Sequence, residues 1–194
     1  MTSREKILAA VKNNQPSFVG LPAMHPPDAE AHPADTFMAT LQSIGGVAFV
    51  IRDIGEIPAI IRAQYPTAEK IVSICPGVEG NTVPGQANPH ALADIDLAII
   101  PAHFGVAENA ACWVTEEPMV ERVLPFICQH LAIVVGKKNI VSNMHQAYEQ
   151  IGDAAYGFGT FIAGPSKTAD IEQSLVLGAH GPKSMIVFLV DDQA

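Results

Sequence analysis

Short apolar runs alternate with amphipathic segments along most of the chain. Continuously apolar stretches of about five residues are typical of strands that are covered on both faces of a sheet. Between them lie segments with apolar residues at helical spacing. Strands are expected at 47–51, 71–74, 97–100, 111–115, 131–135 and 185–190, and helices at 57–64, 120–129, 142–151 and 170–177. This alternation predicts an α/β fold with a largely parallel central sheet flanked by helices.

The N-terminal part has a different pattern. A helix is expected from about residue 4 to 13, with Ser3 as its cap. The stretch 15–33 is rich in proline and predicts an extended arm. A second helix is expected at 37–44, ended by Gly45 and Gly46. We therefore expect an N-terminal helix and arm at 1–33 and an α/β domain at 34–194.

Composition narrows the classes of partner. The chain has 194 residues, 11 Lys and Arg against 20 Asp and Glu, and a formal charge of −9. An acidic surface repels phosphate backbones and anionic lipids, so neither nucleic acid nor a membrane surface is an expected partner. No apolar run reaches the ~18 residues of a spanning helix, and the N-terminus does not resemble a secretory signal.

The metal-binding residue types are dispersed. The three cysteines, Cys75, Cys112 and Cys128, fit neither a disulfide framework nor a zinc cluster, which favours a reducing cytoplasm. The seven histidines show no i, i+4 pair, so no metal site is expected.

The segment 164–172 is a candidate anion site. Gly164 permits close backbone approach, Ser166 and Thr168 offer hydroxyls, and Lys167 adds a cation ahead of the helix expected at 170–177. Together they would bind a carboxylate or a phosphate. The alternative is a plain helix cap at Thr168, with acidic residues in the first turn.

A lone carboxylate follows the strand at 97–100. Glu108 is flanked by small apolar residues, and Asn109 lies beside it. Apolar surroundings would suit Glu108 to acid–base, nucleophilic or ligand-orienting work. The alternative is a surface-turn residue that hydrogen-bonds nearby backbone. His180 lies in the glycine-rich turn before the last strand, either as a pocket residue or as part of an ordinary turn.

Two segments together resemble a known family. Gly-Pro-Ser-Lys-Thr-Ala-Asp-Ile-Glu at 164–172 and Gly-Ala-His-Gly-Pro at 178–182 are similar to the signature of the LUD domain, the lactate utilisation protein C (LutC/YkgG) family. The turn at 107–109 is similar to that family's Ala-Glu-Thr turn, with Asn109 in place of Thr.

The resemblance implies a NagB/RpiA/CoA-transferase-like fold, related to methenyltetrahydrofolate synthetase. It also implies a part in oxidising L-lactate to pyruvate, in a complex with two iron–sulfur partner proteins. In that system this subunit carries no cluster, so no cofactor is expected in this chain. A small 2-hydroxy acid or another carboxylate is the expected ligand, held by Lys167 and its neighbours opposite Glu108.

A free-standing acyl- or CoA-transferase is the alternative function. Glu108 and Asn109 resemble the Glu-Asn-Gly turn that presents the nucleophilic glutamate of CoA-transferases. Ala110 stands where that pattern has glycine.

Overall fold

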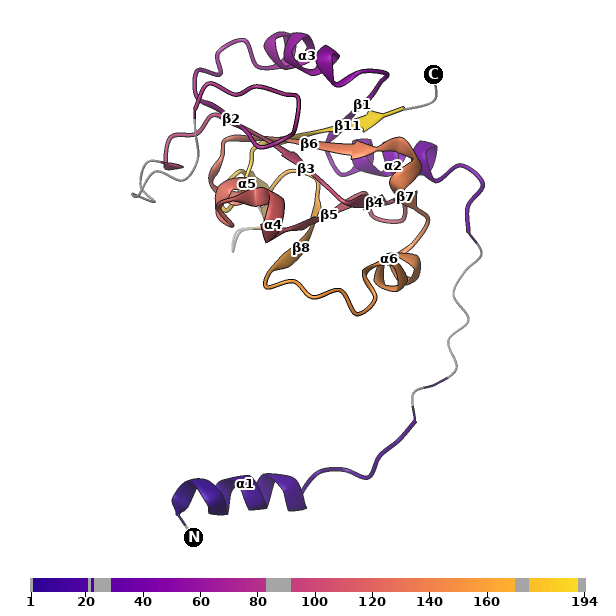
Figure 1. Ribbon diagram of the computed structural model, residues 1–194, viewed down its shortest axis with the longest axis vertical. Coiled ribbons are helices and arrows are strands. Elements are labelled where there is room, and N and C mark those ends of the chain that lie inside the picture. Colours follow the sequence, from indigo (N-terminus) through magenta and orange to yellow (C-terminus); the bar gives the residue numbers. More distant parts are fainter. Residues whose placement is uncertain (1, 21, 23–28, 83–91, 170–174, 192–194) are drawn as a thin grey trace.

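The computed structural model describes residues 2–20, 22, 29–82, 92–169 and 175–191. Its centre is a five-stranded sheet in the order β1-β11-β6-β3-β2, and each pair of neighbours is parallel (Figure 1). The strands are β1 (Val47–Ile51), β2 (Ile71–Ser73), β3 (Leu97–Pro101), β6 (His130–Gly136) and β11 (Ser184–Val190). The predicted α/β fold with a largely parallel sheet is confirmed.

Side chains alternate between the two faces of this sheet, as the strand period of two requires. In β6, Leu131 and Ile133 belong to one buried cluster, whereas Ala132 and Val134 belong to the cluster on the opposite face. Both faces are covered, which is why the sequence of β6 reads as continuously apolar. Helix α3 (Ile57–Gln64) covers one face and helix α2 (Pro33–Ser43) packs on the other.

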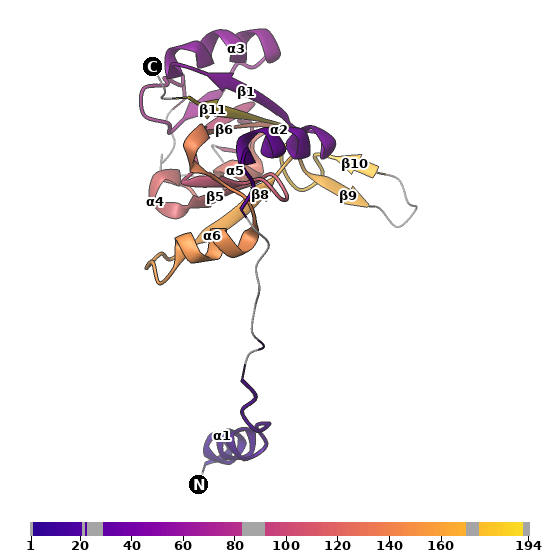
Figure 2. The same ribbon diagram turned by 90° about the vertical axis from the view of Figure 1, so that its right-hand side faces the viewer.

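A second sheet lies beside α2 on the same face, in the order β7-β4-β5-β8 (Figure 2). Its strands are β4 (Phe104–Val106), β5 (Ala111–Thr115), β7 (Ile140–Val141) and β8 (Gly159–Ala163). Its outer face packs on helix α6 (Met144–Ile151) through an aromatic cluster, in which the Trp113 and Phe161 ring centroids lie 4.6 Å apart. The layers are therefore α3, parallel sheet, second sheet with α2, and α6.

A glycine allows α2 to pack against the second sheet. A Cβ at Gly105 in β4 would lie 2.9 Å from a ring carbon of Phe37 and 2.7 Å from the Cδ1 atom of Ile140. Phe37 is fully buried. Any larger residue at position 105 would push this ring out of the core.

Helix α1 (Ser3–Asn13) lies apart from the α/β layers (Figures 1 and 2). Its predicted position is confirmed, although the cap is Thr2 rather than Ser3 and forms a capping box with Glu5. The helix has no buried residue. Farther along the arm, the Glu30 N–H donates to the Ser142 hydroxyl at 2.8 Å and attaches the chain to the domain just before α2.

Two predicted helices are wrong. In place of a helix at 120–129, the chain forms α4 (Glu116–Met119) and α5 (Leu124–Ile127). Between them Val120 has φ +54° and the Glu121 N–H bonds to the Met119 carbonyl, which is a strained γ-turn that no helix accommodates. Pro125 lies in the first turn of α5, where proline is tolerated.

The second is the helix expected at 170–177, which is wrong at 175–177. Strand β10 (Leu175–Leu177) is extended there and pairs antiparallel with β9 (Lys167–Ala169). Residues 170–174 lie outside the described part. The stretch 159–163, which is not among the strands expected from the sequence, forms β8 and pairs with β5. The 3-10 helices η1 (Ile54–Glu56) and η3 (Lys137–Asn139) complete the described elements.

Candidate functional site

The turn between β4 and β5 holds Glu108 at the surface. The Glu108 N–H donates to the Ser142 carbonyl at 3.1 Å, and its carboxylate Oε2 accepts the Met144 N–H at 2.9 Å. Met144 is the first residue of α6, and a carboxylate at a helix N-terminus stabilises the helix. The apolar surroundings expected for Glu108 are not found, because the apolar neighbours turn inward while Glu108 itself is exposed. The Glu108 carboxylate is thus accessible to solvent and accepts one backbone hydrogen bond, from Met144.

Asn109 and Ala110 shape this turn. The Asn109 Oδ1 accepts the Ala111 N–H at 3.0 Å, which is the local side-chain bond typical of Asn in turns. Ala110 is buried and has φ +55°, in the left-handed region that favours glycine. The backbone therefore has the shape that a Glu-Asn-Gly turn would have, although the third residue is alanine.

The second predicted segment starts at the end of β8. Gly164 is buried with φ +70°, and a Cβ there would contact the Ile44 side chain at 3.0 Å. The Ser166 N–H donates to the Pro182 carbonyl at 2.9 Å, and the Ser166 carbonyl accepts the Gly178 N–H at 3.0 Å. The segment 164–169 of the first motif and the second motif at 178–182 therefore form one structural unit. His180 is exposed in the turn of this unit.

The described part of the predicted anion cradle is extended. Thr168 lies in strand β9 and pairs with Val176, and the expected helix start at 170 lies outside the described residues. Consecutive residues of a strand point to opposite faces, which separates Lys167 from Thr168. The Lys167 ammonium lies beside Gly45 at the end of α2, 3.3 Å from the position of a Cβ there. A ligand-binding role for Ser166, Lys167 and Thr168 stays a prediction.

Register brings the two segments to the same end of the second sheet. Ala111 pairs with Ala163. The Glu108 turn, which precedes Ala111, and Gly164, which follows Ala163, are therefore attached to neighbouring strand ends. From there the segments diverge, since Glu108 contacts the start of α6 and Lys167 lies at the end of α2. A joint pocket between Glu108 and Lys167 stays a prediction.

A cavity of about 520 Å³ lies at the carboxyl edge of the parallel sheet, where ligands of open α/β sheets usually bind. It is lined by the start of α2 and by residues that follow β6 and β11, among them His32, Asp35, Lys137, Lys138 and Asp191. The Lys137 Nζ donates to the Asp191 carboxylate at 2.7 Å, and this hydrogen bond raises the pKa of Lys137. Sequence reasoning missed this site. The signal available was the Lys-Lys pair directly after an apolar strand.

The cysteines lie in the cores. Cys75 belongs to the cluster on the α3 side of the parallel sheet, whereas Cys112 and Cys128 belong to the cluster on the other side. Burial raises the pKa of Cys75, and raises the pKa of Cys112 and of Cys128 to about 12. Since the thiolate is the metal ligand, these side chains are poor ligands. Within the described ranges, no group of three or more His, Cys, Asp or Glu side chains is placed to hold a metal ion.

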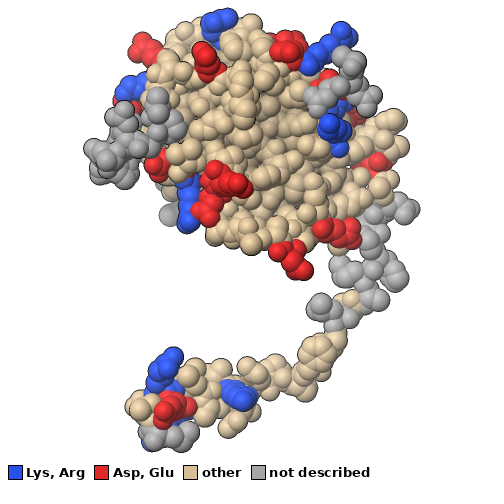
Figure 3. All heavy atoms as spheres, in the orientation of Figure 1, with Lys and Arg blue, Asp and Glu red and all other residues tan. Residues whose placement is uncertain are grey.

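The surface is mixed in charge. On the face shown in Figure 3, the acidic and basic side chains of the described residues are scattered around the rim rather than gathered by sign. None of the helices in the described part of the chain has the length and apolar character needed to cross a membrane.

Sequence comparison identifies related proteins. The family model for the LUD domain matches residues 53–190. A lactate utilization protein C from Geobacillus kaustophilus is 29% identical over 143 residues, covering 71% of this chain and 58% of the relative. One from Bacillus pumilus is 30% identical over 102 residues, covering 50% of this chain and 42% of the relative. The chain thus spans about half the length of these curated relatives.

Structure comparison supports the fold. The crystal structure of a DUF162 family protein from Deinococcus radiodurans superposes with a TM-score of 0.65 at 17% identity. The match covers 84% of this chain and 99% of that chain. At this identity the likeness establishes the fold and nothing more about function.

Proposed function

The chain belongs to the LUD domain family, and from this premise we propose that it is an accessory subunit of a cytoplasmic system that oxidises L-lactate to pyruvate. The observation that carries the proposal is the similarity to lactate utilization protein C, which extends over 71% of the chain in one relative. The matched region includes the Glu108 turn and the unit formed by 164–169 and 175–182.

We further propose that electrons pass through two iron–sulfur partner proteins and that this chain holds no cluster of its own. Support comes from the three thiols, which lie in two separate cores and are kept protonated by burial. An iron–sulfur cluster usually needs four thiolates that converge on one point. Lactate oxidation then requires the partners, and the isolated chain is not an oxidase.

Residues 1–33 are the proposed docking element for such a partner. Helix α1 exposes Ile7, Leu8 and Val11, each more than half accessible. An isolated helix of this length is marginally stable in water, and burial of its apolar face against a partner would stabilise it. The extended arm would let α1 reach a partner surface while the α/β domain stays in place.

A small carboxylate, such as a 2-hydroxy acid, is the proposed ligand of the carboxyl-edge cavity. Lys138 supplies an ammonium group there beside the Lys137–Asp191 ion pair, and the start of α2, the positive end of its dipole, lines the cavity. An ammonium group and the positive end of a helix dipole favour a carboxylate.

Anaerobic affinity purification from lactate-grown cells tests the subunit role. We expect brown iron–sulfur proteins to co-elute with the tagged full chain, and the eluate to reduce a dye when L-lactate is added. A colourless, homogeneous eluate without this activity would overturn the proposal.

The arm is tested by a matched pair of variants in the same purification. Replacement of Ile7, Leu8 and Val11 by Ser should abolish co-elution, because it removes the apolar face of α1. Replacement of the exposed Lys6 and Lys12 by Ser changes the other face and should preserve it. Equal co-elution of both variants would exclude α1 as the docking element.

Acyl transfer through Glu108 is the second candidate function. The observation that favours it is the exposed Glu108 on a turn whose Ala110 adopts the backbone shape of glycine. With an acyl-CoA, the CoA sulfur would replace one Glu108 oxygen, and the acyl group would leave as a carboxylate that carries this oxygen. Mass spectrometry should then find a CoA thioester on Glu108. Absence of the adduct, or its persistence in Glu108→Gln, would refute this function.

A further inference from the structure

A second cavity lies at the amino edge of the parallel sheet, opposite the carboxyl edge that holds the cavity beside Lys137. Its volume is about 460 Å³. Leu97, His130 and Ser184 open β3, β6 and β11 in register, so their strands begin side by side. The lining includes Tyr65, Thr67, Asp94, Asp96, His130 and Lys183.

One wall of this cavity is a hydrogen-bonded relay of three side chains. The Tyr65 hydroxyl lies 2.7 Å from the Ser184 Oγ, and the same Oγ lies 2.8 Å from the His130 Nδ1. The rings of Tyr65 and His130 stack with centroids 4.4 Å apart. Burial and the nearby Lys183 ammonium lower the pKa of His130, while Asp96 opposes this shift. These effects favour the uncharged ring, and the hydrogen bond between its Nδ1 and the Ser184 hydroxyl can form in either direction, depending on the tautomer.

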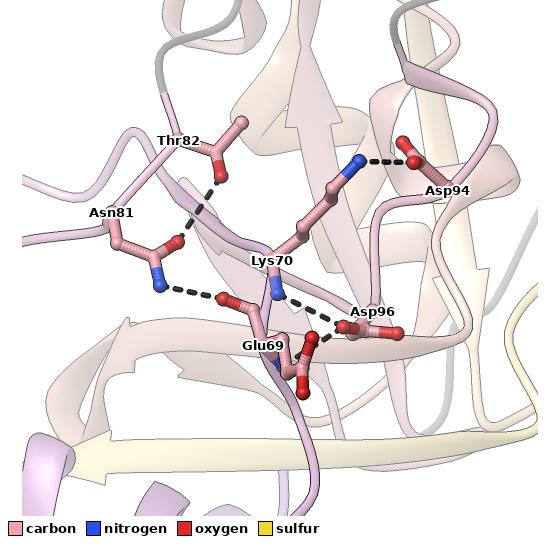
Figure 4. Close-up of polar contacts among 6 residues, drawn as sticks. All are labelled: Glu69, Lys70, Asn81, Thr82, Asp94 and Asp96. Atoms are coloured by element: carbon pink, nitrogen blue, oxygen red, sulfur yellow. Dashed lines mark hydrogen bonds and ion pairs between the residues drawn. The ribbon is translucent and has the colours of Figure 1, made fainter.

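The acidic side chains of the cavity differ in their pairing (Figure 4). Asp94 forms an ion pair with Lys70. The Asp96 Oδ2 accepts the backbone N–H groups of Glu69 and Lys70, each at 2.9 Å. These two bonds lower the pKa of Asp96, so its carboxylate is charged and fixed in place. Its second oxygen, Oδ1, stays available to a ligand.

The remaining charges define the ligand. Once Asp94 and Lys70 neutralise each other, the cavity presents the Asp96 carboxylate and the Lys183 ammonium. Neither forms an ion pair with another residue of the described ranges. A simple anion would meet the Asp96 charge, and a simple cation would meet the Lys183 charge. A ligand that carries one charge of each sign satisfies both groups.

We propose that this cavity binds a small zwitterion of the α-amino-acid class. The ligand carboxylate pairs with the Lys183 ammonium, and the ligand ammonium pairs with the Asp96 Oδ1. The stacked rings of Tyr65 and His130 flank the rest of the ligand. This site lies at the other edge of the sheet from the carboxylate cavity and is independent of lactate chemistry.

Ligand binding to the purified full chain tests the proposal. The common L-amino acids are screened by thermal shift at millimolar concentration, and hits are titrated by calorimetry. L-Alanine and L-lactate form a matched pair, because they differ only by ammonium against hydroxyl. We expect at least one amino acid to raise the unfolding midpoint and Lys183→Gln to abolish that rise, whereas any rise with L-lactate, the proposed ligand of the carboxyl-edge cavity, should persist in Lys183→Gln. No shift with any amino acid, or an amino-acid shift that persists in Lys183→Gln, would overturn the proposal.

Variants locate the binding site for any hit. Asp96→Asn keeps an oxygen for the two backbone N–H groups but removes the charge, and Lys183→Gln removes the ammonium. We expect each to weaken binding about tenfold or more, as loss of one charge pair predicts. Asp94→Asn is the control, since Asp94 is already paired with Lys70, and should retain binding within about twofold. NMR of the His130 ring should respond to the ligand. Unchanged binding in both test variants would refute this location.

Discussion

The Ser184 hydroxyl joins two side chains that are far apart in the sequence, and its removal should destabilise the protein measurably. Ser184 hydrogen-bonds Tyr65 across 119 positions and His130 across 54 positions. Two bonds, each with a net contribution of about 0.5–1.5 kcal/mol, predict a loss of about 1–3 kcal/mol for Ser184→Ala. For a domain of this size the unfolding midpoint should fall by roughly 2–12 °C.

A double-mutant cycle with Tyr65→Phe isolates the hydroxyl bond. Tyr65→Phe keeps the ring stacked on His130 and removes only the oxygen, so we expect a loss of about 0.5–1 kcal/mol. The double variant should lose less than the sum by about 0.5–1 kcal/mol, because Ser184→Ala then leaves no phenol hydroxyl unpaired.

Chemical denaturation followed by circular dichroism measures all three variants. Ser43→Ala is the control, because the Ser43 hydroxyl bonds to Thr40 at an exposed helix end and should matter by less than about 0.5 kcal/mol. Strictly additive losses, or a Ser184→Ala variant as stable as the control, would refute the relay.

Three further predictions follow from local geometry. Gly105→Ala should lower the free energy of unfolding by about 1–3 kcal/mol, since its Cβ would lie 2.9 Å from the Phe37 ring. Gly20→Ala is the control in the same denaturation assay and should have no effect, because Gly20 has open space around it. Val120→Gly should raise stability by about 0.5–1 kcal/mol, because Val120 is exposed and β-branched and has a φ of +54°, which glycine adopts without strain. An unchanged unfolding midpoint would argue against backbone strain at this position. The lowered pKa of His130 means that the unfolded chain binds more protons than the folded chain, so stability should fall as pH drops below about 6.5. Thermal unfolding at pH 7.5 and 5.5 measures this dependence, which His130→Gln should flatten.

The strands of the parallel sheet and helix α3 could be predicted because their signals are local. The expected ranges 47–51 and 57–64 coincide with β1 and α3. Helix α3 has an apolar stripe at helical spacing, and a central strand such as β6 is an apolar run covered on two faces, so in both burial is a property of the segment itself. The edge strand β1 keeps the apolar run although Val47 and Val50 are exposed. Family membership likewise followed from short motifs at 164–172 and 178–182.

The second sheet was harder to predict because its signals are not local. Strand β8 follows Gly157 and begins at Gly159, residues that suggest a loop, yet it pairs with β5 along its whole length. A Cβ at Gly159 would lie 2.5 Å from the Trp113 ring, so the glycine serves side-chain packing rather than a turn. The expected helix at 170–177 failed for a similar reason, since Leu175–Leu177 pairs with Lys167–Ala169 rather than forming local hydrogen bonds.

The sequence by itself therefore determined the class of fold, the central strands and the family, all of which depend on residues close together in the chain. Tertiary structure alone decided which side chains meet. Glu108 was found in the sequence, but its contact with Met144 depends on how α6 packs against the second sheet. Tyr65, His130 and Ser184 meet because β6 and β11 begin in register at the end of α3. Register is a property of paired strands, so no single segment of the sequence contains it.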